Sequence, residues 1–298
     1  MIHAGPALAR RLEELISAEF RRLAAIAPAV LPGVPAECLE AGGGVALWLG
    51  EGSPVNLGVG MGMIAPVGEA ELERVEAFYH DRGAEAVISM CPLADPSLLE
   101  TLGRREWRAS DFEHVLALEL GGGTPAGSVA AGGAAGVDAA LTGPANSAAA
   151  DVDVRVCTTE ERTLWGQIAA HGFADGERPH RRHEEFGAIM AGREDVVLVL
   201  AWVEGTPAGT GALVIDGGVG WLSGDSTLPH YRGRGVQQAS QRHRLLLARE
   251  AGCDLAVTEA APGGGSQRNM ERLGFRIVYT HVEFAKSRTG VLRSRPGG

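Results

Sequence analysis

A long segment of low complexity divides this 298-residue chain close to its middle. From Gly121 to Ala150 nearly every residue is Gly, Ala, Ser, Pro or Thr, and Asp138 carries the only charge. Such a segment buries too little apolar surface to offset the entropy lost on ordering it. The sequence therefore predicts a flexible linker over 121–150, between one domain at 1–120 and a second at 151–298.

The two halves on either side of this linker repeat the same order of elements. In the first half, a predicted helix over 68–82 ends at Gly83. A buried strand, a proline and another helix then lead to a strand that opens at Trp107. The same order runs from Gly252 to Phe275, and the two spacings, 24 and 23 residues, are nearly equal. A repeat longer than about 50 residues indicates a duplicated domain rather than a solenoid. We therefore predict two α/β units, each with a mixed sheet.

The second half contains a strand, a glycine-rich turn and a helix in immediate succession. The strand is predicted over 221–228, the turn over 229–235 and the helix from about Val236 to Gly252. Backbone N–H groups of such a turn, together with the helix N-terminus, favour a bound anion. The matching turn of the first half, at 60–66, has glycines but no basic residue and contains a proline. We expect the first half to lack the anion site.

Composition narrows the class of protein. The chain is 45% hydrophobic and 21% charged, which is ordinary for a globular protein, and its net charge of −10 argues against a nucleic-acid-binding groove. No window approaches the roughly 20 apolar residues of a membrane span, and the first residues lack a secretory-signal pattern. The four cysteines lack the spacing of a metal site. We expect a cytoplasmic protein without a metal, a nucleic-acid partner or a membrane partner.

The second half resembles the GNAT (Gcn5-related N-acetyltransferase) family over about residues 152–286. The resemblance rests on the turn Arg232–Gly235, on the Pro229–Tyr231 that precedes it, and on the closing run Glu271–Phe275. A weaker similarity covers 44–120. The resemblance implies two GNAT-like domains in tandem, the first of them degenerate.

The resemblance also implies a co-substrate and the residues that hold it. GNAT proteins bind acetyl-CoA with its pyrophosphate in this turn and its pantetheine along the preceding strand, here at Thr227 and Leu228. The residues expected at the pyrophosphate are Arg232, Gly233, Arg234, Gly235, Val236, Gln237 and Gln238, with Asn269 as a further contact to CoA. A Rossmann site fits less well, because no third glycine follows Gly235 in the way that fingerprint requires.

Two positions depart from the family's pattern. The last small residue of the turn is Gln237 here, so the pyrophosphate is expected to sit differently or to gain a side-chain contact. Many members place a tyrosine near the closing run, where it protonates the leaving thiolate, and that position is Met270 here. The general acid is therefore left unassigned.

Direct acyl transfer to an amine needs a base that accepts the proton of the nucleophile. Asp225 lies two residues before Thr227, so the two side chains share a face of a regular strand, and Ser223 is expected on that same face. Glu259 lies near the end of the following strand. The alternatives are a solvated or capping carboxylate for Asp225 and an ion pair at the sheet edge for Glu259.

The acceptor is expected to be an amine on a small molecule or a peptide. In the family the segment that here carries His180, Arg181, Arg182 and His183 lines the acceptor site, and the alternative is a solvated basic face. The function expected is N-acetyl transfer from acetyl-CoA. Two alternatives remain: a non-catalytic acyl-CoA-binding or regulatory module, and an enzyme that forms an amide on the precursor of a thiol cofactor. The protein is expected to be a monomer or a homodimer.

Overall fold

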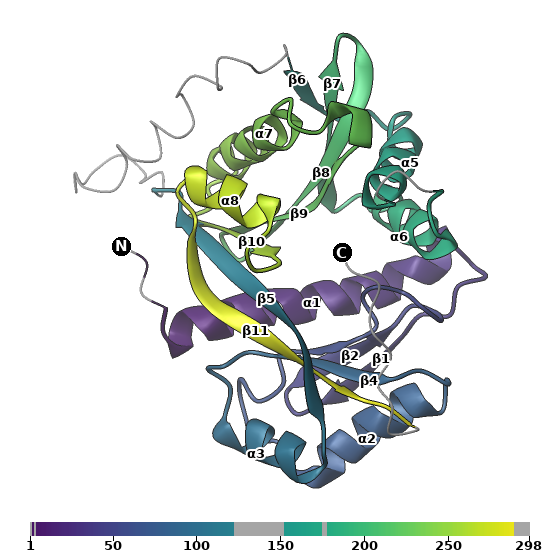
Figure 1. Ribbon diagram of the computed structural model, residues 1–298, viewed down its shortest axis with the longest axis vertical. Coiled ribbons are helices and arrows are strands. Elements are labelled where there is room, and N and C mark those ends of the chain that lie inside the picture. The colour runs from purple at the N-terminus through teal and green to yellow at the C-terminus, as the bar shows by residue number, and fades with distance from the viewer. Residues whose placement is uncertain (1, 3, 122–151, 175–177, 289–298) are drawn as a thin grey trace. The chain divides into compact units, whose positions relative to one another are not determined.

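The computed structural model describes residues 2, 4–121, 152–174 and 178–288 (Figure 1). The chain divides into two compact units, which we describe separately. The N-terminal unit comprises His3–Val115 and Val278–Gly298, and the C-terminal unit comprises Met1–Ile2 and Leu116–Ile277. The last strand of the chain thus groups with the first half of the sequence. Apart from Gly121, the predicted linker lies outside the described residues, so a boundary within 121–150 remains a prediction.

The N-terminal unit is a mixed sheet with helices on both faces. Its helices are α1 (Pro6–Val30), α2 (Glu69–His80) and α3 (Pro96–Arg104). Its strands are β1 (Glu37–Ala41), β2 (Gly44–Trp48), β3 (Gly58–Val59), β4 (Ala86–Met90) and most of β5 (Arg108–Glu119) and β11 (Arg276–Lys286). They lie in the order β1-β2-β3-β4-β11-β5. In Figure 1, α1 covers one face of this sheet, and α2 and α3 cover the other.

Helix α1 forms because apolar residues recur along one face at helical spacing. Leu12, Ile16 and Phe20 on that face are buried. Pro28 lies inside this helix, which continues to Val30. The Leu31 N–H donates to the Ala27 carbonyl at 2.8 Å, so the last turn keeps a hydrogen bond although the proline lacks its own N–H.

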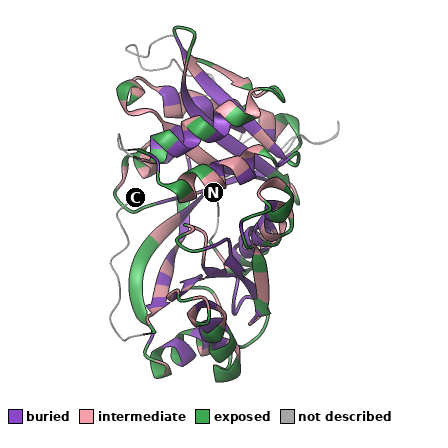
Figure 2. Ribbon diagram, turned by 90° about the vertical axis from the view of Figure 1, so that its right-hand side faces the viewer, coloured by how far each residue is buried: buried purple, intermediate pink, exposed green. Residues whose placement is uncertain are grey.

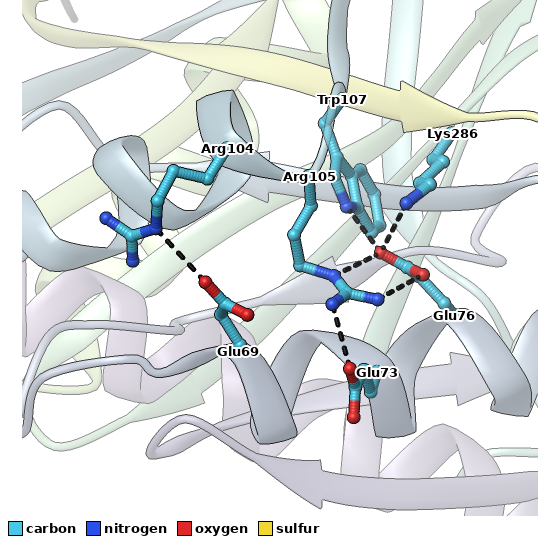
Figure 3. A network of polar contacts seen from close by, with 7 residues as sticks. All are labelled: Glu69, Glu73, Glu76, Arg104, Arg105, Trp107 and Lys286. Carbon is cyan, nitrogen blue, oxygen red and sulfur yellow. Dashed lines mark hydrogen bonds and ion pairs between the residues drawn. The ribbon is translucent and has the colours of Figure 1, made fainter.

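Strand β11 is held in the N-terminal unit by polar contacts on both of its faces. On one face, the Tyr279 hydroxyl donates to Glu13 Oε1 of α1 at 2.8 Å, and His281 Nε2 lies 2.6 Å from the same oxygen. On the other face, Lys286 Nζ donates to Glu76 Oε1 of α2 at 3.0 Å (Figure 3). These contacts explain why the C-terminal end of the chain groups with its N-terminal half.

The Glu76 carboxylate is the centre of the network in Figure 3. Arg105 donates to both of its oxygens at 2.9 Å, and the Trp107 indole N–H donates at 2.9 Å. Burial opposes ionisation of this carboxyl, but the hydrogen bonds from Arg105, Lys286 and Trp107 outweigh it and lower the pKa of Glu76 to about 2. Glu76 therefore stays ionised and joins α2, the end of α3 and β11.

In the C-terminal unit the strands lie in the order β5-β10-β9-β8-β7-β6, which belongs to the same 11-stranded sheet. Its own strands are β6 (Val152–Val156), β7 (Val196–Val203), β8 (Thr206–Asp216), β9 (Val219–Thr227) and β10 (Leu255–Ala260). Its helices are α5 (Arg162–Phe173), α6 (Arg181–Ala191), α7 (Val236–Glu250) and α8 (Gly265–Arg272). In Figure 1, α5 and α6 lie on one face of β7–β9 and α7 on the other.

Buried residues lie on most strands, whereas the first half of β5 and the outer faces of the helices are exposed (Figure 2). The core on the α7 side of the C-terminal unit includes Leu213, Leu222, Leu245 and Phe275. The predicted fold class, α/β with a mixed sheet, is confirmed. Within the described part of the chain, no helix is both long enough and apolar enough to cross a bilayer.

Candidate functional site

The candidate site forms where β9 leaves its ladder with β10. These parallel strands pair from Val219 with Leu255 as far as Trp221 with Val257. Beyond that point β9 continues to pair with β8 up to Thr227, but no further β9–β10 pair occurs in the described residues. The edge of β9 that faces β10 therefore lies outside the ladder in the stretch that leads to the glycine-rich turn.

A β-bulge interrupts β9 in this same stretch. Thr210 of β8 pairs with Ser226 and Ala212 pairs with Ser223, so Gly224 and Asp225 together oppose the single residue Gly211. Gly224 has a φ of +62°, in the left-handed region that favours glycine. A bulge bends the strand and redirects its side chains. The sequence prediction that Ser223 shares a face with Asp225 is therefore wrong, because the extra residue interrupts the alternation.

Side chains from the helices on both sides contact the bulge. On the α5 side, a Cβ on Gly224 would come 3.1 Å from the ring of Trp165, whose indole N–H donates to the Gly211 carbonyl at 3.1 Å. On the α7 side, a Cβ on Gly211 would come 2.5 Å from Arg244 Nε. The two glycines therefore leave room for a buried indole on one face and a buried guanidinium on the other.

Asp225, the first candidate base, forms an ion pair with Arg244. The Arg244 side chain is completely buried, and the Asp225 side chain is 12% exposed. Burial raises the pKa of the Asp225 carboxyl, and the charge and hydrogen bond of Arg244 partly oppose this rise. Neither reading offered for Asp225 from the sequence, a catalytic base or a solvated carboxylate, includes this buried partner.

The turn after β9 presents backbone N–H groups at the start of α7. Gly235 is the N-cap residue of α7, with a φ of +83°, and no side chain caps the helix there. Gly233, with a φ of +75°, also requires the left-handed conformation. The N–H groups of Val236, Gln237 and Gln238 open the helix and have no intrahelical acceptor. The geometry is that of an anion site.

The two arginines of the turn are oriented away from this set of N–H groups. Arg232 donates from Nη2 to the Gly172 carbonyl at the end of α5, at 3.0 Å. Arg234 donates to Glu204 at 3.2 Å and lies over the Tyr231 ring. Their backbone N–H groups are engaged as well, since the Arg232 N–H donates to the Pro229 carbonyl at 3.3 Å and the Arg234 N–H donates to the Tyr231 carbonyl at 3.4 Å.

Amide side chains connect the first turn of α7 to α8. Asn269 Nδ2 donates to Gln237 Oε1 at 2.7 Å, and Gln238 Nε2 donates to Asn269 Oδ1 at 3.3 Å. Gln237 Nε2 also donates to Ser266 Oγ at 3.2 Å. The structure thus brings together Asn269 and the two glutamines that the sequence singles out, at one end of α7.

The remaining candidates lie around this centre. Leu228 donates its N–H to the Ala208 carbonyl at 2.9 Å and accepts from Tyr231 N–H at 2.9 Å, so little of its backbone is left for pantetheine. Thr227 is half-buried at the end of β9. Glu259 is half-buried two residues beyond the last β9–β10 pair. Met270 is completely buried in the core, so no polar group stands at that position.

The histidines and arginines on α6 are largely engaged within that helix. His180 caps α6 by accepting from the Arg182 N–H, and Arg181 and Arg182 both bind Glu185, at 2.8 and 2.6 Å. Burial, and then the charge of His180, lower the pKa of His183. Its ring lies 6.3 Å from that of Phe173 between centroids. In the described residues, no group of His, Cys, Asp and Glu side chains is arranged to hold a metal ion.

Sequence reasoning missed Arg244, Trp165, Gly211 and Gly224, all of which shape the bulge. One signal was available, because an isolated glycine inside a strand pattern suggests a bulge. Arg244 gave a weaker signal, as an arginine one position before Leu245 on the buried stripe of α7.

Comparison with known proteins agrees with this geometry. Residues 162–275 match the family model described as "Acetyltransferase (GNAT) family". The chain is similar in structure to a GCN5-related N-acetyltransferase from Kribbella flavida (TM-score 0.56, 22% identity, covering 93% of this chain and 95% of the other). It is also similar to a tandem GNAT protein from the clavulanic acid biosynthesis pathway (TM-score 0.55, 14% identity, 89% and 87% covered).

A GCN5-related N-acetyltransferase from Sphaerobacter thermophilus has a comparable fold (TM-score 0.54, 17% identity, 84% and 75% covered). A search of curated proteins found no match. The family match covers α5 to Phe275, which includes β9, the glycine-rich turn and α7. The family model therefore identifies a GNAT-like domain over residues 162–275 of this chain.

Proposed function

We propose that the C-terminal unit binds acetyl-CoA and transfers its acetyl group directly to an amine on a small molecule or a peptide. The observation that carries the proposal is the junction of β9 and α7. There, a strand edge outside the ladder leads directly to a helix N-terminus that begins at a left-handed glycine and has no side-chain cap. An extended amide chain that ends in a pyrophosphate matches this order of features.

The residues at this junction fit CoA. The N–H groups from Gly235 to Gln238 would hold the pyrophosphate, because they open α7, whereas the Arg234 N–H already donates to the Tyr231 carbonyl at 3.4 Å. Thr227 and the second lone pair of the Leu228 carbonyl would bind the pantetheine amides. Asn269, already bonded to Gln237 and Gln238, would fix these two side chains beside the phosphates.

In the chemical step, the amine nitrogen attacks the thioester carbonyl, a tetrahedral intermediate forms, and the carbon–sulfur bond breaks. Asp225 or Glu259 would take the proton from the amine, directly or through water. Burial raises the pKa of the Asp225 carboxyl, which makes the carboxylate a stronger base. The charge and hydrogen bond of Arg244 act in the opposite direction and stabilise the ionised carboxylate. The Met270 side chain cannot protonate the leaving group. A thiolate whose thiol has a pKa of about 8.5 needs less protonation to leave than an alkoxide does.

We propose a single such site in each chain. The corresponding turn of the N-terminal unit is occupied by its own chain. The Gly62 N–H donates to the Gly42 carbonyl at 2.9 Å, and the Val67 N–H donates to Ser97 Oγ at 2.8 Å. Met61 is buried in the core of that unit. The Gly62 N–H is thus already engaged, and Pro66 has no N–H to donate to a pyrophosphate.

The second candidate function is a non-catalytic acyl-CoA-binding or regulatory module. The buried Met270 favours it, since the general acid common in the family is absent from that position. We also propose a reducing compartment such as the cytoplasm for the protein, because all four cysteines are free thiols.

The two candidates differ in turnover. The test is release of free CoA from acetyl-CoA, followed with a thiol reagent in the presence of a panel of a polyamine, an aminoglycoside and a lysine-containing peptide. Release that depends on one amine, with the acetylated amine found by mass spectrometry, supports the transferase. Tight CoA binding without release for any amine supports the binding module.

A further inference from the structure

We propose that Arg244 is a positioning residue for this site, because it holds the bulge of β9 in the shape that the reaction requires. For its effect on rate the proposal rests on the proposed function, whereas its effect on β9 can be measured independently. Arg244 contacts neither the glycine-rich turn nor Asn269 among the hydrogen bonds of the described residues.

The guanidinium of Arg244 binds both strands at the bulge. Its Nη1 donates to the Ala212 carbonyl of β8 at 2.9 Å and to the Ser223 carbonyl of β9 at 2.9 Å. Its Nη2 binds the Asp225 carboxylate. One rigid group therefore fixes the residue before the bulge, the bulge residue Asp225 and the strand opposite.

The local sequence makes room for this group. A Cβ on Gly211 would lie 2.5 Å from Nε and 2.6 Å from Cζ of Arg244, so only glycine permits the guanidinium to lie against β8. On the opposite face, Trp165 lies against Gly224 and Thr210 Oγ1 donates to the Gly224 carbonyl at 2.9 Å. The bulge is thus held from both faces of the sheet.

A lysine cannot replace this arrangement. The guanidinium is a planar fork with five N–H donors, whereas an ammonium is a compact point charge. A lysine at 244 keeps the counter-charge for Asp225 but cannot reach both carbonyls and the carboxylate with the same geometry. Arg244→Lys therefore removes the donor geometry of the guanidinium but keeps its positive charge.

The site would respond to a shift of the bulge because Asp225 and the following edge of β9 lie on it. A displacement of about 1 Å in reacting groups lowers rates by up to about a hundredfold. The turn from Arg232 to Gln238 lies beyond the bulge and keeps its own hydrogen bonds. We therefore expect kcat to fall while CoA affinity changes little.

The experiment compares wild type, Arg244→Lys and the control Arg249→Lys, an identical change five residues further along α7. For Arg244→Lys we expect kcat to fall at least about tenfold with the best amine of the panel, and the dissociation constant of CoA to change less than about threefold. Amide exchange should quicken in the peptide over 219–227 but not in the peptide over 255–273. Arg249→Lys should resemble wild type.

Gly211→Ala is the second variant, in case Arg244→Lys fails to fold. It keeps every polar group but moves the guanidinium, and the same pattern of rate and exchange is expected. Unchanged kcat and unchanged exchange in both variants would overturn the proposal. Exchange that quickens equally in all peptides would also overturn it, because Arg244 would then support only general stability. If wild type itself transfers no acetyl group, the proposed function fails, and the exchange data alone decide whether Arg244 fixes the bulge.

Discussion

Replacing Glu76 by Gln tests how strongly one carboxylate stabilises the N-terminal unit (Figure 3). The pKa of this carboxyl falls from 4.5 to about 2. At about 1.4 kcal/mol per pKa unit, the ionised form contributes on the order of 3 kcal/mol to folding at neutral pH. Because the folded-state pKa is the lower one, the contribution is complete above about pH 4.5 and is lost as the pH falls toward 2.

The assay is urea unfolding of Glu76→Gln at pH 7 and at pH 3, followed by amide exchange in peptides of α2 and β11. The matched control is Glu69→Gln, since Glu69 pairs with Arg104 at 3.2 Å while 56% exposed. An exposed pair contributes at most about 1 kcal/mol. We expect a loss of about 3 kcal/mol for Glu76→Gln at pH 7, with a smaller loss at pH 3. Equal small losses for the two variants would refute the reasoning.

Three further predictions concern the C-terminal unit and the last strand. Gly235→Asp should abolish CoA binding in calorimetry through charge repulsion. The control Gly252→Asp, at a residue with a similar φ of +82° at the other end of α7, should retain CoA binding. Equal CoA affinity in both variants would contradict the assignment of the turn as the pyrophosphate site. Asp225→Asn should lower kcat and flatten its dependence on pH with little change in CoA affinity, and an unchanged pH profile of kcat would remove Asp225 as the base. Deleting Arg276–Gly298 should remove protection against amide exchange from β4 and α2, because β11 pairs with β4 and binds both α1 and α2. Full protection of β4 and α2 in the deletion variant would show that the N-terminal unit folds without β11.

Much of the fold follows from local signals in the sequence. The helices predicted over 68–82 and from about Val236 to Gly252 correspond to α2 (Glu69–His80) and α7 (Val236–Glu250). The turn before α7 was also predictable, because glycines at 233 and 235 mark left-handed positions. Local patterns suffice where neighbouring residues decide the conformation.

Strand β1 was missed although a signal for it exists. Its sequence, Glu37–Ala41, contains two glutamates and an alanine, which are weak strand formers. It forms because it pairs with β2 across Gly42 and Gly43, both with positive φ, as a two-residue hairpin requires. The pairing of the strand therefore outweighs its own weak propensity.

Long-range partners account for what the sequence could not supply. No local pattern places β11 beside β4, since the contacts of Lys286 with Glu76 and of His281 with Glu13 join opposite ends of the chain. Likewise, the role of Arg244 depends on a bulge in β9 and on a glycine in β8. A periodicity argument counts Arg244 as an exception on a buried face, and only the folded structure identifies its partners.

The central claim is that each chain holds one acetyl-CoA, in the C-terminal unit. Calorimetric titration of the full chain with acetyl-CoA tests it most directly. The account predicts one site per chain, lost in Gly235→Asp and kept in Gly252→Asp. No binding at near-millimolar acetyl-CoA, or two sites per chain, would contradict it.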